Sequence, residues 1–194
     1  MTNLSPTAEN ILDCARSLIV AGGYNGFSYA DIAGVVGIRK ASIHHHFPSK
    51  ADLVQALVAR YRAQAREGLA QLSAHVTDPA RQLEAYLGYW RNCIADNSAP
   101  ICVSALLASE IPLLPDAVAA EVQAHFRSLA KWLEGALARG EAEGSLTLTS
   151  APKIEAEAFM ATVHGAMLSA RAYGDADIFA TVTRSLMQKI MPAI

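Results

Sequence analysis

Apolar residues recur three and four positions apart along almost the whole chain, which is the spacing of one face of an α-helix. The alternation of polar and apolar residues that is typical of β-hairpins does not occur. Glycine, proline and N-cap residues divide the helical pattern into about nine segments. We expect helices at residues 7–21, 28–36, 40–47, 49–73, 79–96, 101–110, 115–139, 152–173 and 175–191, and either Gly140 or Gly144 ends the seventh. The sequence therefore predicts an all-α fold.

Three short helices are predicted within roughly the first 47 residues, and a turn that contains Gly37 joins the second to the third. Two short helices joined in this way are typical of a helix-turn-helix, whose second helix enters the major groove of DNA. That helix would begin with Arg39, Lys40, Ala41 and Ser42. Such side chains can pair with guanine or phosphate, or contact a thymine methyl group. We predict that this helix binds DNA, with His44 and His45 further along it, within reach of the DNA backbone.

Several short motifs around this helix follow one another at a specific joint spacing. They are Asp31-Ile32-Ala33, Gly37-Ile38, His46-Phe47 and Ser49-Lys50-Ala51-Asp52-Leu53. Over roughly residues 7–55 the chain resembles the DNA-binding domain of TetR/AcrR-type transcriptional regulators. The resemblance implies a dimeric repressor that leaves its operator when a small molecule binds. It also implies a helix-turn-helix domain at residues 1–48 and a helical ligand-binding and dimerisation domain at residues 49–194.

The resemblance implies roles for individual residues as well. Ser28 matches a position that caps the second helix and contacts phosphate. Lys50 matches a lysine at the start of the fourth helix, where its ammonium and the helix N-terminus can both favour a phosphate. The groove-facing start of the recognition helix is matched by Arg39, Lys40 and Ser42. Two positions depart from the family pattern, because His44 replaces a common tyrosine and Arg39 replaces a common small capping residue.

The charge distribution places any contact with a polyanion in the N-terminal third. The chain has 194 residues, a formal net charge of -2 and 52% hydrophobic residues, as an ordinary globular protein has. Residues 1–66 hold seven basic and four acidic residues, whereas the remainder holds nine basic and fourteen acidic ones. The asymmetry is mild, but its sign suits DNA binding by the first helices.

Aromatic and polar residues of the later helices could line a pocket for a small effector. The candidates are Tyr61, Tyr86, Tyr89, Trp90, Cys93, Cys102, Phe126, Met160 and His164. Their few charges favour an uncharged or weakly charged hydrophobic effector. The alternative is that they form only the core, because aromatic residues at helical spacing usually do. Cys102 could sense an electrophile or oxidant near a helix N-terminus, or it could be a buried, inert thiol.

The last two helices carry patterns that favour a homodimer built as a four-helix bundle, which would bind a pseudo-palindromic operator. Small residues of the eighth helix are Ala158, Ala161, Thr162, Gly165, Ala166, Ser169 and Ala170. Apolar residues of the ninth helix are Ile178, Val182, Leu186 and Ile190. Small residues let helices approach closely. An intramolecular core explains them almost as well.

Other classes of function find little support. Adjacent helical residues point about 100° apart, so His44, His45 and His46 do not converge easily on one ion, and we predict neither a metal nor a cofactor. Enzyme motifs such as G-x-S-x-G, H-E-x-x-H or a P-loop do not occur, so we predict no enzyme. Three scattered cysteines, and no apparent signal peptide or membrane-length apolar segment, favour a cytoplasmic protein. The second hypothesis is a helical small-molecule binding protein with little DNA affinity, since the first helix lacks arginines that are common in the family.

Overall fold

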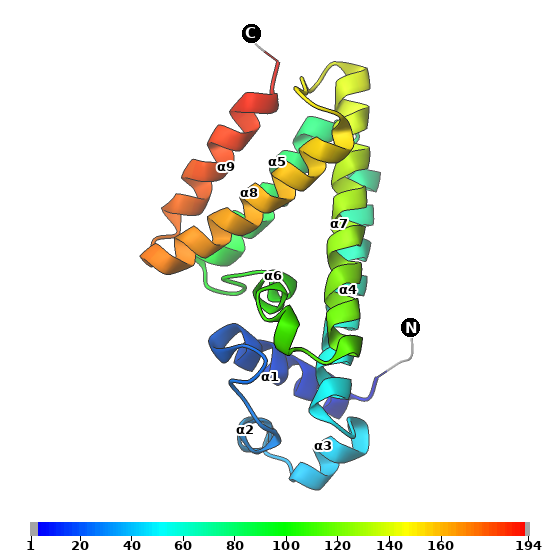
Figure 1. The fold of residues 1–194 in the computed structure, drawn as a ribbon, viewed down its shortest axis with the longest axis vertical. Helices are drawn as coiled ribbons and strands as arrows, with labels where there is room; N and C mark the ends of the chain where they lie inside the picture. Colours follow the sequence, from blue (N-terminus) through cyan, green and yellow to red (C-terminus); the bar gives the residue numbers. More distant parts are fainter. Residues whose placement is uncertain (1–3, 193–194) are drawn as a thin grey trace. The chain divides into compact units, whose positions relative to one another are not determined.

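The computed structural model describes residues 4–192, which form nine α-helices and one short 3₁₀ helix (Figure 1). The elements are α1 (Pro6–Gly22), α2 (Tyr29–Val36), α3 (Lys40–His46), α4 (Lys50–His75), α5 (Pro79–Ala95), α6 (Val103–Ala108), η1 (Ile111–Leu113), α7 (Asp116–Glu143), α8 (Pro152–Tyr173) and α9 (Asp177–Ile190). The predicted all-α fold is confirmed. In the described range, no helix combines the length and apolar character that crossing a lipid bilayer requires.

Side-chain caps determine where several helices begin. At α2 the Asp31 carboxylate accepts a hydrogen bond from the backbone N–H of Ser28 at 2.7 Å, and the Ser28 hydroxyl accepts one from the first turn at 3.2 Å. Ser49 and Asp52 repeat this capping box at the start of α4, with distances of 2.9 and 3.2 Å. At α5 the Asp78 carboxylate accepts from the first turn at 2.9 Å. The S-x-x-D and Asp-Pro signals in the sequence predict these starts.

The chain divides into two compact units. Unit 1 comprises the residues up to Ala63 together with Val103–His125, so it contains α1 to α3, the first part of α4, α6, η1 and the start of α7. Within it, α1 packs against α2, α3 and α6. Its core includes the fully buried side chains of Ile11, Leu12, Ile19, Ile32, Ile43, Leu53, Leu57 and Leu107. The first three helices therefore share one core with α6.

Unit 2 comprises Gln64–Cys102 and the residues from Phe126 onward. In it α8 and α9 form a hairpin that turns at Gly174, whose backbone is left-handed, and α5 also packs against α9 (Figure 1). The buried side chain of Gln82 accepts a hydrogen bond from Arg139 at 2.9 Å and donates one to a backbone carbonyl at 2.6 Å. This glutamine joins α5 to α7 and leaves neither end of its amide unpaired.

Two segments refine the expectations drawn from sequence. Of the two glycines expected to end the seventh helix, Gly144 directly follows its last residue, Glu143, whereas Gly140 lies within the helix. A Cβ at Gly140 would lie 2.4 Å from Leu146 Cδ1, so this glycine permits close packing of the following loop and does not end the helix. The predicted helix at 101–110 is shorter, and η1 follows it as a separate turn. Pro112 removes a backbone donor there and so prevents α6 from continuing.

The predicted interface residues of α8 and α9 divide between two faces. On α8, Ala166 and Ala170 are buried, whereas Ala158, Ala161 and Gly165 are exposed. Thr162 and Ser169 are half-buried. On α9 the buried residues are Phe179, Thr183, Met187 and Ile190. Of the predicted stripe, Ile178, Val182 and Leu186 are half-buried. Ala166, Ala170 and Ile190 are therefore buried within the chain, which for these three residues agrees with the intramolecular alternative.

Two glycines of α2 and its C-terminal turn form a matched pair for testing this backbone geometry. Gly37 has a φ of +73°, where a side chain is strained even though a Cβ would meet no atom within 4 Å. Gly37→Ala should therefore lower the free energy of unfolding by about 1 kcal/mol. Gly34→Ala, equally open but within the helix, should raise it by about 0.5–1 kcal/mol. Urea unfolding of both variants is the measurement, and effects of the same sign would contradict the left-handed turn.

Candidate nucleic-acid interface

The turn between α2 and α3 is closed by hydrogen bonds to one carbonyl group. The N–H groups of Gly37 and Ile38 donate to the Ala33 oxygen at 3.0 and 3.2 Å. This is the pattern of a helix that ends on a left-handed glycine. Ile32 and Ile43 are the buried residues of α2 and α3, respectively, and they anchor the two helices in the core of unit 1. The other side chains of α3 do not pack into this core and are more accessible to solvent.

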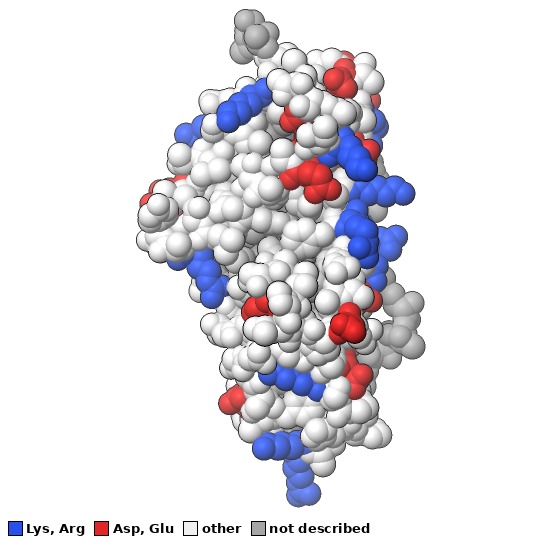
Figure 2. Space-filling model, in the orientation of Figure 1, with Lys and Arg blue, Asp and Glu red and all other residues white. Residues whose placement is uncertain are grey.

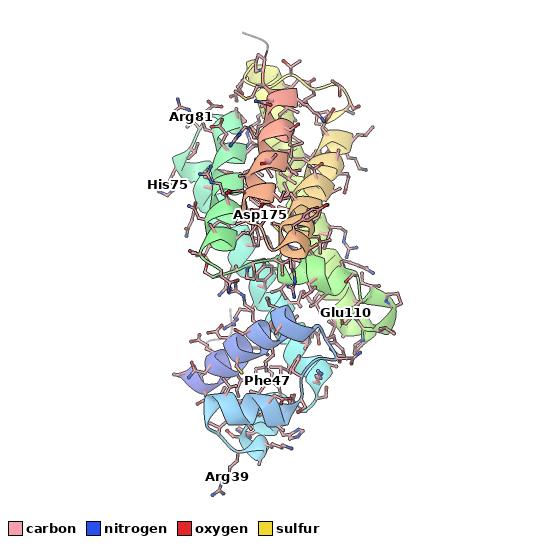
Figure 3. The ribbon with its side chains drawn as sticks, turned by 90° about the vertical axis from the view of Figure 1, so that its left-hand side faces the viewer. Arg39, Phe47, His75, Arg81, Glu110 and Asp175 are labelled. Carbon is pink, nitrogen blue, oxygen red and sulfur yellow. The ribbon has the colours of Figure 1, made fainter. Side chains whose placement is uncertain are left out.

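The predicted groove-facing residues lie on that surface. Arg39, Lys40 and Ala41 are exposed, and Ser42 is half-exposed. Arg39 is the N-cap residue of α3 and forms no side-chain cap bond, and its side chain extends away from the helices (Figure 3). On the face shown in Figure 2, the charged atoms at the very end of unit 1 are those of Lys and Arg. The helix thus presents positive charge and hydrogen-bond donors to solvent.

His44 and His45 differ in their surroundings. His44 Nδ1 lies 3.1 Å from the Pro48 carbonyl oxygen, and its ring meets the Tyr29 ring edge-on with 4.7 Å between centroids. The Tyr29 hydroxyl donates to the Phe47 carbonyl at 2.8 Å, and burial raises the pKa of Tyr29 to about 12. His45 is exposed. Across residues 4–192, no cluster of three or more His, Cys, Asp or Glu residues is placed to hold a metal ion.

Ser28 and Lys50, the two predicted phosphate contacts, both make bonds within the protein. The Ser28 hydroxyl donates to the Asp31 carboxylate at 2.8 Å, and these hydrogen bonds hold the pKa of Asp31 below its usual value. The Lys50 ammonium donates to the Phe27 carbonyl oxygen. Burial lowers the pKa of Lys50. An ammonium has three N–H donors, so the bond to Phe27 does not prevent Lys50 from also binding a phosphate. Phosphate binding by Lys50 stays a prediction.

The candidate effector residues do not form one group. Tyr61 belongs to unit 1, where its ring lies 5.3 Å from that of His125. The other candidates belong to unit 2. Of these, the buried ones are Tyr86, Trp90, Cys102, Met160 and His164, and the half-buried ones are Cys93 and Phe126. Tyr89 is 57% exposed in this chain. The burial of Cys102 favours the inert-thiol alternative over a reactive one.

Aromatic side chains of unit 2 meet in its interior. Tyr86 and Trp132 have ring centroids 5.7 Å apart. Burial raises the pKa of the Tyr86 hydroxyl, so the phenol is neutral at physiological pH. Phe126 lies 5.1 Å from the ring of His164. The sequence spacing places Trp132 on the same helix as Phe126 but does not show which of the two meets Tyr86.

His164 carries an unpaired polar atom in this interior. The residue is 8% exposed, and its Nε2 has no hydrogen-bond partner among the described residues. Burial lowers the pKa of His164 to about 4, so the imidazole is neutral near pH 7. A buried nitrogen without a partner costs free energy, which makes it a suitable anchor for a polar atom of a ligand. The Ser104 hydroxyl of unit 1 is likewise buried and unpaired within the described residues.

Glu110 is not among the residues predicted from the sequence, and its carboxylate accepts a hydrogen bond from the backbone N–H of Tyr24 at 2.9 Å. The two residues are 86 positions apart, so no local pattern connects them. The nearest signal in the sequence is Gly23, a glycine at the end of the first helix. Gly23 has a positive φ of +74° and lies against Glu110, so besides ending the helix it leaves room for the Glu110 carboxylate.

Two family descriptions match the chain. The family described as "Bacterial regulatory proteins, tetR family" matches residues 11–57. The family described as "Tetracyclin repressor-like, C-terminal domain" matches residues 79–186, which is more than half of the chain. The first match covers the helix-turn-helix, and the second covers α5 to most of α9.

Individual relatives agree with these matches. The structure of a TetR-family transcriptional regulator from Agrobacterium tumefaciens is 60% identical, covers 96% of this chain and 98% of that one, and has a TM-score of 0.94. A TetR transcriptional regulator from Legionella pneumophila is 28% identical, with 97% and 100% coverage and a TM-score of 0.86. The HTH-type transcriptional repressor DhaR of Mycobacterium sp. (strain GP1) is 22% identical over 165 residues, 84% of this chain and 82% of the relative. These proteins are regulators rather than enzymes, and the chain belongs to the TetR family of bacterial transcriptional regulators.

Proposed function

We propose that this regulator is a repressor that binds a palindromic operator as a homodimer and is released by a small hydrophobic effector. The observation that carries the DNA-binding part is the exposed, basic start of α3, with Arg39 and Lys40 in solvent while Ile43 anchors the helix. The description of DhaR as a repressor supports the sign of regulation. Because its partner is chromosomal DNA, we place the protein in the cytoplasm.

We assign DNA binding to residues 1–48, and effector binding and dimerisation to residues 49–194. α4 contributes residues to both compact units and is one continuous helix. A change in the effector domain can therefore reach the residues after α3 through a rigid element. The effector must bind more tightly to the state that does not fit the operator, because a ligand with equal affinity for both states shifts nothing.

The dimer contact is assigned to the outer face of α8 together with α9. Ile154 and Leu168 of this face are 62% and 50% exposed, and small residues lie between them at helical spacing. Those small residues are Ala158, Ala161 and Gly165. Exposed apolar side chains around a row of small residues suit close packing of the same face from a second copy.

The effector is assigned to the interior of unit 2. The rings of Tyr86, Trp132 and Phe126 offer apolar contact, and the unpaired nitrogen of His164 offers a hydrogen bond. Since this imidazole is neutral near pH 7, it suits an uncharged molecule with one polar group better than an anion. Such an environment agrees with the hydrophobic effector expected from the sequence.

Selection of random double-stranded DNA by the purified protein tests DNA binding. We expect a palindromic motif whose affinity falls steeply with salt. Arg39→Ala should then lower affinity about ten-fold or more and make the salt dependence shallower by about one unit per lost phosphate contact. Arg81→Ala, an exposed arginine on α5, is the matched control and should change neither. Failure to recover a motif would favour the small-molecule binding protein instead.

Leu168→Glu tests the dimer face. A carboxylate at this position would be buried unpaired between two copies, so we expect the variant to be monomeric and to lose operator affinity. Size-exclusion chromatography with light scattering reads out the mass. Leu113→Glu makes the same substitution at an exposed leucine of η1 and should leave the mass at that of a dimer. A dimeric Leu168→Glu variant would contradict the assignment.

Because His164 is neutral when buried, the free energy of unfolding should fall as the pH is lowered. Its pKa falls from 6.5 to about 4 on folding, so the unfolded chain binds the proton more readily between these values. Stability should be unaffected by this group above pH 7 and should fall by up to about 1 kcal/mol per pH unit as the pH drops from 6.5 toward 4. His164→Gln should remove that part of the slope in urea unfolding between pH 7 and 4.5. Identical slopes in both proteins would show that the imidazole is not buried as described.

A further inference from the structure

Glu110 ties the corner after α6 to the loop that starts the helix-turn-helix. Its Oε2 accepts the hydrogen bond from the backbone N–H of Tyr24 at 2.9 Å. Tyr24 lies at the start of the loop 23–28, which leads from α1 to Ser28, the N-cap residue of α2. Both partners belong to unit 1, and Figure 3 labels Glu110 beside this loop. The contact therefore joins two segments that are distant in sequence within one core.

Gly23 is the residue that admits the carboxylate. It has a φ of +74°, and a Cβ there would lie 2.3 Å from Glu110 Oε1. Any side chain would push the carboxylate away and would strain the backbone as well. Glu110 is fixed by its own backbone, whose N–H donates to Leu107 at 3.0 Å and whose carbonyl accepts from Leu113 at 2.8 Å. The contact is thus specified by the glycine on one side and by the α6–η1 corner on the other.

Lys50 secures the other end of the same loop. Besides donating to the Phe27 carbonyl, its ammonium lies 4.1 Å from the ring centroid of Phe27 and 5.1 Å from that of Tyr24. Burial lowers the pKa of Lys50, whereas the negative charges of Asp31 and Glu110 oppose that shift. Glu110 therefore favours the charged form of Lys50 in addition to holding the Tyr24 amide. The loop 23–28 is therefore held near its start by Glu110 and near its end by Lys50.

We propose that Glu110 is a positioning residue for operator binding, because its carboxylate holds the start of the loop 23–28 in the arrangement that places α2 and α3 against DNA. This inference rests on the proposed function, since it concerns affinity for an operator. The expected effect of removing Glu110 on operator affinity is opposite to the effect that electrostatic repulsion alone would give. An acidic side chain on a DNA-binding unit repels phosphate, so its removal alone would strengthen binding. Here its removal weakens binding, because the loop loses its tie.

The test uses the full-length protein and an operator recovered by selection with the unaltered chain. Operator affinity is measured over a range of salt concentrations for Glu110→Ala and Glu110→Gln. Exchange of the Tyr24 amide hydrogen is followed in the same proteins without DNA. The control is Glu121→Ala, which removes a carboxylate of the same unit that accepts bonds from Arg62 at 2.9 and 3.1 Å and does not bond to the loop. Urea unfolding of each variant compares their overall stability.

We expect Glu110→Ala to bind the operator about ten-fold more weakly, as loss of a hydrogen bond to a charged group implies, with an unchanged salt slope and faster exchange at Tyr24. Glu110→Gln keeps an oxygen that can accept from Tyr24, so it should recover most of the affinity. Glu121→Ala should bind within about two-fold of the unaltered chain even where its stability is equally reduced.

Unchanged or tighter binding by Glu110→Ala, a loss of affinity equal to that of Glu121→Ala, or no recovery in Glu110→Gln would each overturn the inference. These outcomes are distinct from failure of the proposed function, in which the unaltered chain itself selects no operator. A changed salt slope would also overturn it, because it would mean that the substitution alters the phosphate contacts themselves.

Discussion

Helices of eight and seven residues are too short to be stable alone in water, and this constraint governs α2 and α3. Each has one fully buried anchor, Ile32 or Ile43. With such small anchors, the direction of α3 depends on the turns at its ends and on the loop that precedes α2. The polar contacts of unit 1 are concentrated at these points. Gly37 bends the chain, Tyr29 bonds to the turn after α3, and Lys50 bonds to the loop before α2.

Unit 2 is built differently, because its helices are long enough to be held by continuous apolar faces. Most of α7, from Phe126 onward, and all 22 residues of α8 belong to it, and both helices bury residues along their length. Polar atoms are scarce inside and are mostly paired, as Gln82 and the Trp132 indole are. The unpaired nitrogen of His164 departs from that rule. In a well-packed interior, an unpaired polar atom indicates a ligand site more strongly than another aromatic ring does. The reason is that a side chain with all its polar atoms paired would make the chain more stable.

The sequence predicted those features that are determined by neighbours in the chain. The capping boxes at Ser28 and Ser49 and the turn at Gly37 are local, and they occur where the motifs indicated. Features that depend on distant partners could not be predicted. Gly140 is a residue type that often ends a helix, but here it packs closely against Leu146 of the following loop. Glu110 lies in no recognisable motif, and its partner Tyr24 is distant in sequence.

Helix phase is a second feature that the sequence leaves open, since α9 carries apolar residues on adjacent positions and its sequence alone does not show which row is buried within the chain. Ile178 and Phe179 both fit an apolar stripe, and packing against α8 and α5 selects the row that contains Phe179. For the candidate effector residues, the pattern predicted which helix each lies on but not which way each side chain points. Tyr89 is exposed, for example, whereas its neighbour Trp90 is buried. Residue type and spacing therefore predicted the helices better than the site.

With the proposed dimer contact, the exposed apolar face of α8 would link the protein's action to its own abundance. Leu168 and Ile154 are in contact with water in the single chain, so burying them favours association. Below the dissociation constant of a dimer, the concentration of dimer rises with the square of the concentration of subunits. An operator that needs two copies would then fill over a narrow range of protein level, and a modest change in synthesis or degradation would act as a switch.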